Sequence, residues 1–251
     1  MFLSFEDRLS DSPLVERVWR SRSERDGAFT SVAACTWEMV VTRHRGETTL
    51  TVRGPETRPS DAFAPAGGAW LGIRFKVGTF MPQLPVEGIR DRKDVVLPQA
   101  TKRAFWLDGS AWEYPTFENA EAFVARLVRA GRIGRDPVVD DVVRGRPGIV
   151  STRTVQRRFL RATGLTHGAF RQIERARRAA YVLTQGAPIL EAAGTAGYYD
   201  QAHLTRALHR WIGRTPGAIA RGEEQLSFLY KTTPDRGDTL GTFAPSGVPH
   251  E

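Results

Sequence analysis

The most informative segment of this chain is Ser151-Thr152-Arg153-Thr154-Val155-Gln156-Arg157-Arg158-Phe159-Leu160-Arg161-Ala162-Thr163-Gly164. Ser151 suits an N-cap and Gly164 suits a left-handed helix end, so the pattern predicts a helix over residues 152–163. Val155 and Phe159 are four residues apart and must face a core. The opposite face is basic and polar, so we expect one buried stripe and one face that is open to a partner.

This helix belongs to an arrangement that occurs twice in the chain. A short helix expected over Pro137–Arg144 precedes it, and a short helix over Pro188–Ala196 precedes a second longer helix over Gln201–Ile212. Each longer helix begins at a capping residue and ends at a glycine. A short helix, a turn and a longer helix with a polar outer face are typical of the helix-turn-helix motif, whose second helix enters the major groove of DNA.

A single long helix is expected between the two pairs. It covers Gly168–Gln185, and 18 residues at about 1.5 Å per residue span about 27 Å. Successive major grooves recur about every 34 Å along one face of the duplex. The spacing therefore predicts that one protomer reads two short half-sites about one helical turn apart.

The positive charge is concentrated in this helical segment. Residues 1–115 hold 16 basic and 15 acidic side chains, whereas residues 116–223 hold 18 arginines, no lysine and 9 acidic side chains. A basic segment of domain size is typical of a protein that binds a polyanion such as DNA. An arginine-rich genome would spread arginine evenly along the chain, but the first 115 residues are nearly neutral.

The polar faces of the two longer helices carry side chains that suit DNA. Arginine can bond both guanine O6 and N7, and glutamine can do the same with adenine N6 and N7. Hydroxyl and amide groups at a helix N-terminus sit well against phosphate. The alternative is an ordinary helical bundle with a solvated arginine face. The candidates are Ser151, Thr152, Arg153, Gln156, Arg157 and Arg161 in the first helix, and Gln201, Thr205 and Arg206 in the second.

Further residues at fixed spacing surround these helices. They read Arg177-x2-Ala180-x2-Leu183, then Ile189-x-Glu191-x-Ala193-x3-Gly197-Tyr198-Tyr199-Asp200-Gln201-Ala202-His203-Leu204-x-Arg206, then Gly213-x-Thr215-Pro216. With the opening stretch, this set resembles the DNA-binding domain of AraC/XylS transcription regulators over residues 137–221. The resemblance implies that Arg153, Gln156 and Arg157 face bases in the first helix, and that Gln201, Ala202, Thr205 and Arg206 do so in the second. It also implies an N-terminal β domain, often cupin-like, that senses a small molecule, mediates dimerisation, or both.

Residues 1–115 have the pattern of β structure. Short apolar or alternating runs at 30–41, 48–53, 69–77 and 95–97 are separated by turn signals such as Arg45-Gly46-Glu47. Strands at this spacing predict a barrel or sandwich, and a cupin-like form is implied by the resemblance alone. Helices are also expected over Phe117–Ala130 and Pro216–Arg221. The fold class is therefore α+β with two domains: a β sensor or dimerisation domain at 1–115 and a helical DNA-binding domain at 116–223, followed by a flexible tail at 224–251.

Four residues are candidates for an effector pocket in the N-terminal half. Trp37, Trp70 and Phe75 lie in or beside expected strands, with Arg74 among them. Such aromatic side chains are more often core than pocket. An Arg74 that points inward with them would need an anion, supplied either by the protein or by an effector.

The sequence shows no pattern typical of catalysis or metal binding. The first 115 residues contain one histidine, His44, and the whole chain contains one cysteine, Cys35. We expect Cys35 to be a buried thiol, with a redox-sensing role as the alternative. No Ser-His-Asp spacing, phosphate-binding loop or dinucleotide-binding glycine motif is present. We therefore expect no catalytic residue, no metal and no cofactor.

These observations predict a cytoplasmic, sequence-specific DNA-binding regulator of transcription. Its candidate partners are double-stranded DNA, RNA polymerase, an unidentified small-molecule effector and a second copy of the chain. A membrane is not expected, because no run of about 20 apolar residues occurs. Two alternatives stay open: a small-molecule-binding β-barrel enzyme fused to a helical DNA tether, and a helical module whose arginine face docks an acidic protein.

Overall fold

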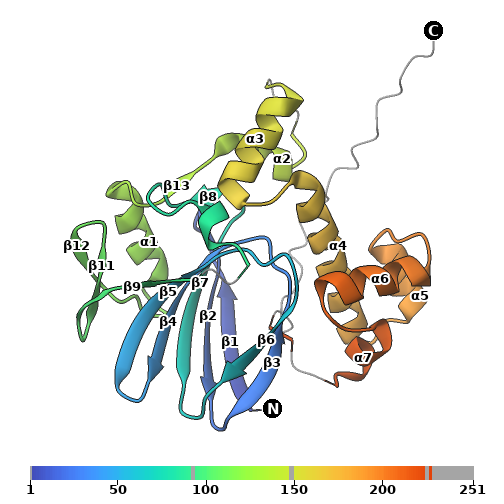
Figure 1. The fold of residues 1–251 in the computed structure, drawn as a ribbon, viewed down its shortest axis with the longest axis horizontal. Helices are drawn as coiled ribbons and strands as arrows, with labels where there is room; N and C mark the ends of the chain where they lie inside the picture. The colour runs from blue at the N-terminus through green and yellow to red at the C-terminus, as the bar shows by residue number, and fades with distance from the viewer. Residues whose placement is uncertain (1, 92–93, 147–149, 224–225, 228–251) are drawn as a thin grey trace.

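The computed structural model describes residues 2–91, 94–146, 150–223 and 226–227, and its first half is rich in strands (Figure 1). A β-rich N-terminal region is therefore confirmed, whereas a cupin-like form stays a prediction. The strands are β1 (Leu3–Leu9), β2 (Val15–Ser23), β3 (Gly27–Ser31), β4 (Glu38–His44), β5 (Glu47–Arg53), β6 (Ser60–Ala64), β7 (Ala69–Phe75), β8 (Thr79–Phe80), β9 (Val95–Leu97), β10 (Gln99–Thr101), β11 (Ala104–Leu107), β12 (Ser110–Glu113) and β13 (Gly134–Arg135).

The main sheet has six antiparallel strands in the order β1-β2-β7-β4-β5-β9. Its clearest hairpin joins β4 to β5 through Arg45 (φ 51°) and Gly46 (φ 80°), two left-handed residues of the kind that tight hairpins require. Alternation along β5 places Leu50 and Val52 on one face, where both are fully buried. Smaller sheets join β10-β11-β12, β8 with β13, and β3 with β6.

Helix α1 (Ala120–Arg129) packs on the main sheet and shares its core. Phe123 and Leu127 are fully buried, and the Phe123 ring meets Phe105 of β11 edge-on. Ile133, just after the helix, belongs to the same core. The chain therefore leaves the core of the main sheet at residues 134–136. The sequence pattern changes earlier, at residue 115.

The second half of the chain is helical, which confirms the predicted helices to within three residues at each end. Helix α4 runs from α3 to the group formed by α5, α6 and α7 (Figure 1). None of the helices among the described residues is both long and apolar enough to cross a membrane. The remaining helices are η1 (Val86–Ile89), α2 (Pro137–Val143), α3 (Thr152–Thr163), α4 (His167–Thr184), α5 (Ile189–Thr195), α6 (Gln201–Trp211) and α7 (Pro216–Arg221).

The core of the helical half contains a segment of the N-terminal half. Val32, Ala33 and Cys35, which follow β3, are buried in the cluster formed by α3 to α7. The Cys35 thiol donates a long hydrogen bond to the Phe170 carbonyl (3.7 Å), and burial raises the pKa of this thiol well above its usual value. Cys35 is therefore confirmed as a buried thiol, and the two halves of the chain share a core.

The tail expected at residues 224–251 lies largely outside the described residues, with Leu226 and Ser227 as the exceptions. Leu226 is buried and forms a parallel bridge to Thr30. The Ser227 amide donates to the Thr30 carbonyl at 2.9 Å. These two residues therefore lie against β3.

Candidate nucleic-acid interface

Helices α2 and α3, here called the first helix pair, begin at capped positions. The Asp136 carboxylate accepts from the amides of Val138 and Val139, and Pro137 starts α2. The Ser151 hydroxyl accepts from the Thr154 amide at 3.4 Å at the start of α3. Ser151 thus caps its helix, as the sequence predicted, and remains exposed at its N-terminus.

Helix α3 buries one stripe and exposes the other. Phe159 is fully buried, and its ring meets His167 and Phe170 edge-on at centroid distances of 5.3 and 5.4 Å. Burial lowers the pKa of His167, with the nearby charge of Arg171 as a smaller cause. The candidates on the other stripe, all exposed, are Thr152, Arg153, Gln156, Arg157 and Arg161.

Arg158, next to these candidates, has a different role. Its Nε donates to Asp136 Oδ2 at 2.9 Å, so it ties α3 to the start of α2. Among the described residues, Arg153, Arg157 and Arg161 form no ion pair. Of the four arginines in α3, Arg158 therefore holds α3 to α2, and the other three are available to bind a ligand.

Helices α5 and α6, here called the second helix pair, repeat this design in the longer helix, whereas α5 starts after Pro188 without a side-chain cap. Asp200 Oδ1 accepts from the His203 amide at 2.6 Å and caps α6. Thr205, half-buried, donates its hydroxyl to the Gln201 carbonyl at 2.8 Å, so that hydroxyl is already used within the helix. Gln201, Ala202 and Arg206 are exposed, whereas Leu204 and Leu208 are fully buried.

A link between α4 and the second helix pair was not foreseen from the sequence. Arg175 of α4 donates to the Gly197 carbonyl at 2.8 Å and lies over the Tyr198 ring at 4.3 Å. Arg171 and Arg178 of the same helix, and Arg210 of α6, are exposed cations that the motif did not include. Their helical spacing alone could have identified them as a basic surface, because each lies on the exposed side of its helix.

The structure does not bring the four effector candidates into one cavity. Trp37 and Phe75 stack at a centroid distance of 3.9 Å and are buried, and the Trp37 indole donates to the Thr79 carbonyl at 2.7 Å. Alternation along β7 places Trp70 and Arg74 on the face opposite Phe75. Arg74 lies 3.6 Å from Glu38, so the anion that it was expected to need is a protein carboxylate.

Trp70 lines a groove, but its neighbours there are not the other three effector candidates. This groove has a volume of about 580 Å³ and is lined in part by Arg20, Arg22 and Arg43. Phe117 also lines it, and Arg20 lies over the Phe117 ring at 4.5 Å. Trp70 therefore borders an open groove, together with arginines that the sequence did not single out.

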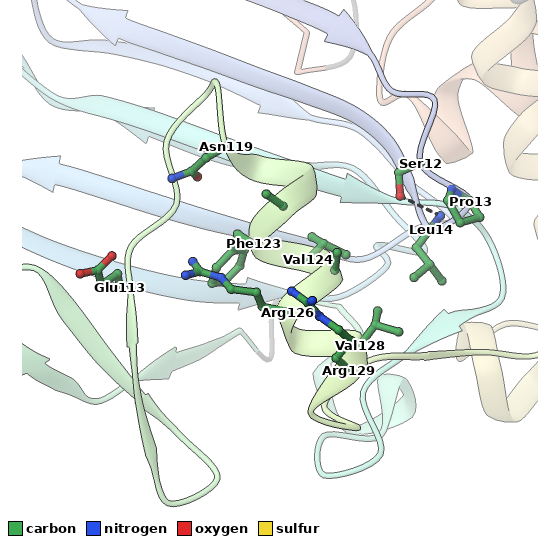
Figure 2. Close-up of a pocket in the computed structure, with 12 residues that line it drawn as sticks. Ser12, Pro13, Leu14, Glu113, Asn119, Phe123, Val124, Arg126, Val128 and Arg129 are labelled. Carbon is green, nitrogen blue, oxygen red and sulfur yellow. Dashed lines mark hydrogen bonds between the residues drawn. The ribbon is translucent and has the colours of Figure 1, made fainter.

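A larger groove of about 740 Å³ lies along α1 (Figure 2). Leu14, from the turn between β1 and β2, faces Val124 and Val128, and Arg126 and Arg129 extend from the exposed side of the helix. These two arginines form no ion pair with the described residues. In contrast, Glu121 of the same helix is bound by Arg8 at 2.5 Å, and this contact lowers the pKa of Glu121 to about 2.

Comparisons with known proteins agree with the geometry of the helical half. Residues 149–222 match the family described as a helix-turn-helix domain. HTH-type transcriptional regulator RipA of Corynebacterium glutamicum is 36% identical over 95 residues, which are 38% of this chain and 28% of that protein. The chain thus covers less than a third of this relative's length. No solved structure matches the present chain. Residues 149–222 therefore contain a helix-turn-helix domain, and these comparisons support the resemblance to AraC-type transcriptional regulators that the sequence indicated.

Proposed function

We propose that this chain is a sequence-specific DNA-binding regulator of transcription that reads two adjacent major grooves, one with α3 and one with α6. The observation that carries the proposal is the repeated design of the two helix pairs. Each longer helix has a capped N-terminus, a buried apolar stripe and an exposed face with arginine and glutamine. Helix α4, with 18 residues between them, is about 27 Å long, close to the separation of successive grooves.

The base-facing residues in this proposal are those on the exposed stripes. Arg153, Gln156 and Arg157 would contact base edges from α3, and Gln201, Ala202 and Arg206 would do so from α6. The DNA backbone at the edge of the site would be contacted by Ser151, Thr152 and Arg161 and by Thr205, which lies beside Arg206. The proposal assigns no covalent chemistry to the chain, because the matching family is one of transcription regulators. It places the protein with its DNA in the cytoplasm, with RNA polymerase as the target of regulation.

Selection of binding sites from random duplex DNA tests the proposal directly. The full chain, at about 150 mM salt so that non-specific phosphate binding is weak, is expected to enrich two short blocks whose centres lie about 10 base pairs apart. The matched control is the double variant Gln201→Ala/Arg206→Ala, which should lose the second block and keep the first. Enrichment of one block by the unmodified chain would contradict reading by two helices. Enrichment of none by folded protein would contradict the proposed function.

A regulatory input through the N-terminal region is the second part of the proposal, either as a bound small molecule or as a second copy of the chain. The groove along α1 supports a small molecule, because it combines apolar side chains with Arg126 and Arg129, which form no ion pair among the described residues. Its volume lies within the range of about 300–1,000 Å³ that is usual for ligand sites. This combination suits a small carboxylate with an apolar body.

Thermal denaturation of the full chain with straight-chain carboxylates and the matched alcohols tests the groove. Carboxylates are expected to raise the melting temperature and alcohols are not, with a stabilisation of about 2.7 kcal/mol at a ligand concentration 100 times the Kd. The double variant Arg126→Gln/Arg129→Gln should lose the shift. An equal shift in this variant would exclude the groove along α1 and point to the groove beside Trp70.

A further inference from the structure

The two longer helices end in the same way, at a left-handed glycine that lies against the N-terminal region (residues 2–133). Gly164 (φ 68°) follows α3, and a β-carbon at this position would lie 3.4 Å from Val86. Gly213 (φ 83°) follows α6, and a β-carbon there would lie 3.0 Å from the ring of Pro59. Glycine is therefore required at both helix ends for its backbone conformation, and at Gly213 also for the close approach.

The end of α3 is held by a short segment around η1. Arg90 donates from Nη1 to the Gly164 carbonyl at 3.0 Å. Val86 and Ile89 of η1 are buried, and η1 packs against α3. The start of α2 is held as well, because the Asp136 amide donates to the Gly78 carbonyl at 2.8 Å.

The end of α6 is held by the segment that follows β3. The Ala33 amide donates to the Trp211 carbonyl at 2.9 Å. Arg214 donates to the Gly213 carbonyl at 2.9 Å and to the buried Thr30 hydroxyl at 2.7 Å, and so bridges the helix end and β3. Arg177 of α4 donates to the Ala33 carbonyl at 3.0 Å, so the same segment also holds the helix that joins the two pairs.

From these contacts we propose that the N-terminal region is a bracket that fixes the separation of the two reading helices and thereby sets the spacing of half-sites that the protein accepts. Arg90, Thr30 and Arg214 are positioning residues in this bracket. The held ends are the C-terminal ends, whereas the opposite ends, with Arg153 and Gln201, are exposed. This inference rests on the proposed function, because it assumes that α3 and α6 both read DNA.

The physical reason is the effective concentration of one helix pair at its half-site once the other has bound. A rigid connection of the right length raises overall affinity by about 10²–10⁴-fold over either site alone, and a connection that cannot span the sites gives no gain. A rigid bracket therefore predicts high affinity at one spacing and a steep loss at others. Helices joined by α4 alone, without the bracket, would tolerate a wider range of spacings with less gain.

The test measures affinity of the full chain for duplexes in which the two selected blocks are separated by the selected gap or by one to three extra base pairs. A duplex with one block scrambled reports single-block affinity. Two variants loosen the bracket. Gly213→Ala places a methyl group against Pro59, and Thr30→Val/Arg90→Met removes the two side-chain contacts. Gly186→Ala is the matched control, because Gly186 also ends a helix in a left-handed conformation (φ 86°) but has no atom within 4 Å of the added carbon.

Both bracket variants are expected to lose about tenfold or more of the two-block advantage at the selected gap and to show a flatter dependence on the gap. Their single-block affinity should equal that of the unmodified chain, and Gly186→Ala should keep the steep dependence. A steep dependence in folded bracket variants, as judged by circular dichroism, would overturn the inference, and so would an equal loss of single-block affinity. A wild-type chain that binds one-block and two-block duplexes equally would instead overturn the proposed function.

Discussion

Phe159→Ala is expected to lower the free energy of unfolding by about 3–5 kcal/mol, the usual cost of removing a large aromatic side chain from a core. Phe159 is fully buried and joins α3 to α4 through its contacts with His167 and Phe170. Ala162 and Thr163, the other buried residues of α3, have small side chains that cannot fill the space. Urea denaturation followed by circular dichroism measures the change.

Leu160→Ala is the matched control for this prediction. Leu160 is the next residue in α3, but 37% of its surface is exposed, so its removal should cost about 1 kcal/mol or less. The difference between the two variants reports the burial of Phe159. Equal costs would contradict the packing of α3 against α4 and, with it, the first helix pair.

Arg157→Ala is expected to weaken specific DNA binding by about 1–3 kcal/mol and to relax the preference at one base pair. Its guanidinium is exposed on α3 and forms no ion pair with the described residues, so it can bond a guanine edge. Fluorescence anisotropy with the selected duplex and with a random duplex measures both effects. Equal weakening on the two duplexes would mean that Arg157 contacts phosphate instead.

Salt dependence and a neighbouring arginine are the controls for this second prediction. Each neutralised phosphate contributes a slope of about −0.9 to the logarithm of affinity against the logarithm of salt. Arg157→Ala should leave this slope unchanged if the residue contacts a base. Arg158→Ala should lower stability without relaxing base preference, because Arg158 is bonded to Asp136. A flat salt response of the unmodified chain would favour the module that docks an acidic protein.

The helices were predictable because their signals are local. Ser151 and Asp200 cap the two longer helices, and Gly164 and Gly213 follow their ends, as the sequence indicated. Strands β5 and β9 were also predicted, from β-branched and apolar runs. Strands β1, β2 and β6 were not, because each gains its hydrogen bonds from a partner that short sequence windows do not reveal.

The effector candidates on β7 also depended on distant strand partners that a short stretch of sequence does not reveal. Residues 70–75 were correctly placed in an extended run, but which face lies in the core depends on the partners of β7. Phe75 lies on the core face with Trp37, and Arg74 lies on the other face beside Glu38. Nothing local to these residues distinguishes the two faces.

The two helix pairs, their exposed arginine faces and the helix-turn-helix character of residues 149–222 can be read from the amino-acid sequence, because each depends on residues within one or two helical turns. Only the tertiary structure placed α1 on the main sheet and Val32 and Ala33 in the helical core. It alone placed Gly164 against Val86 and Gly213 against Pro59. Those contacts join residues about 80 and 150 positions apart, and a gap of that length leaves no periodic or capping signal in the chain.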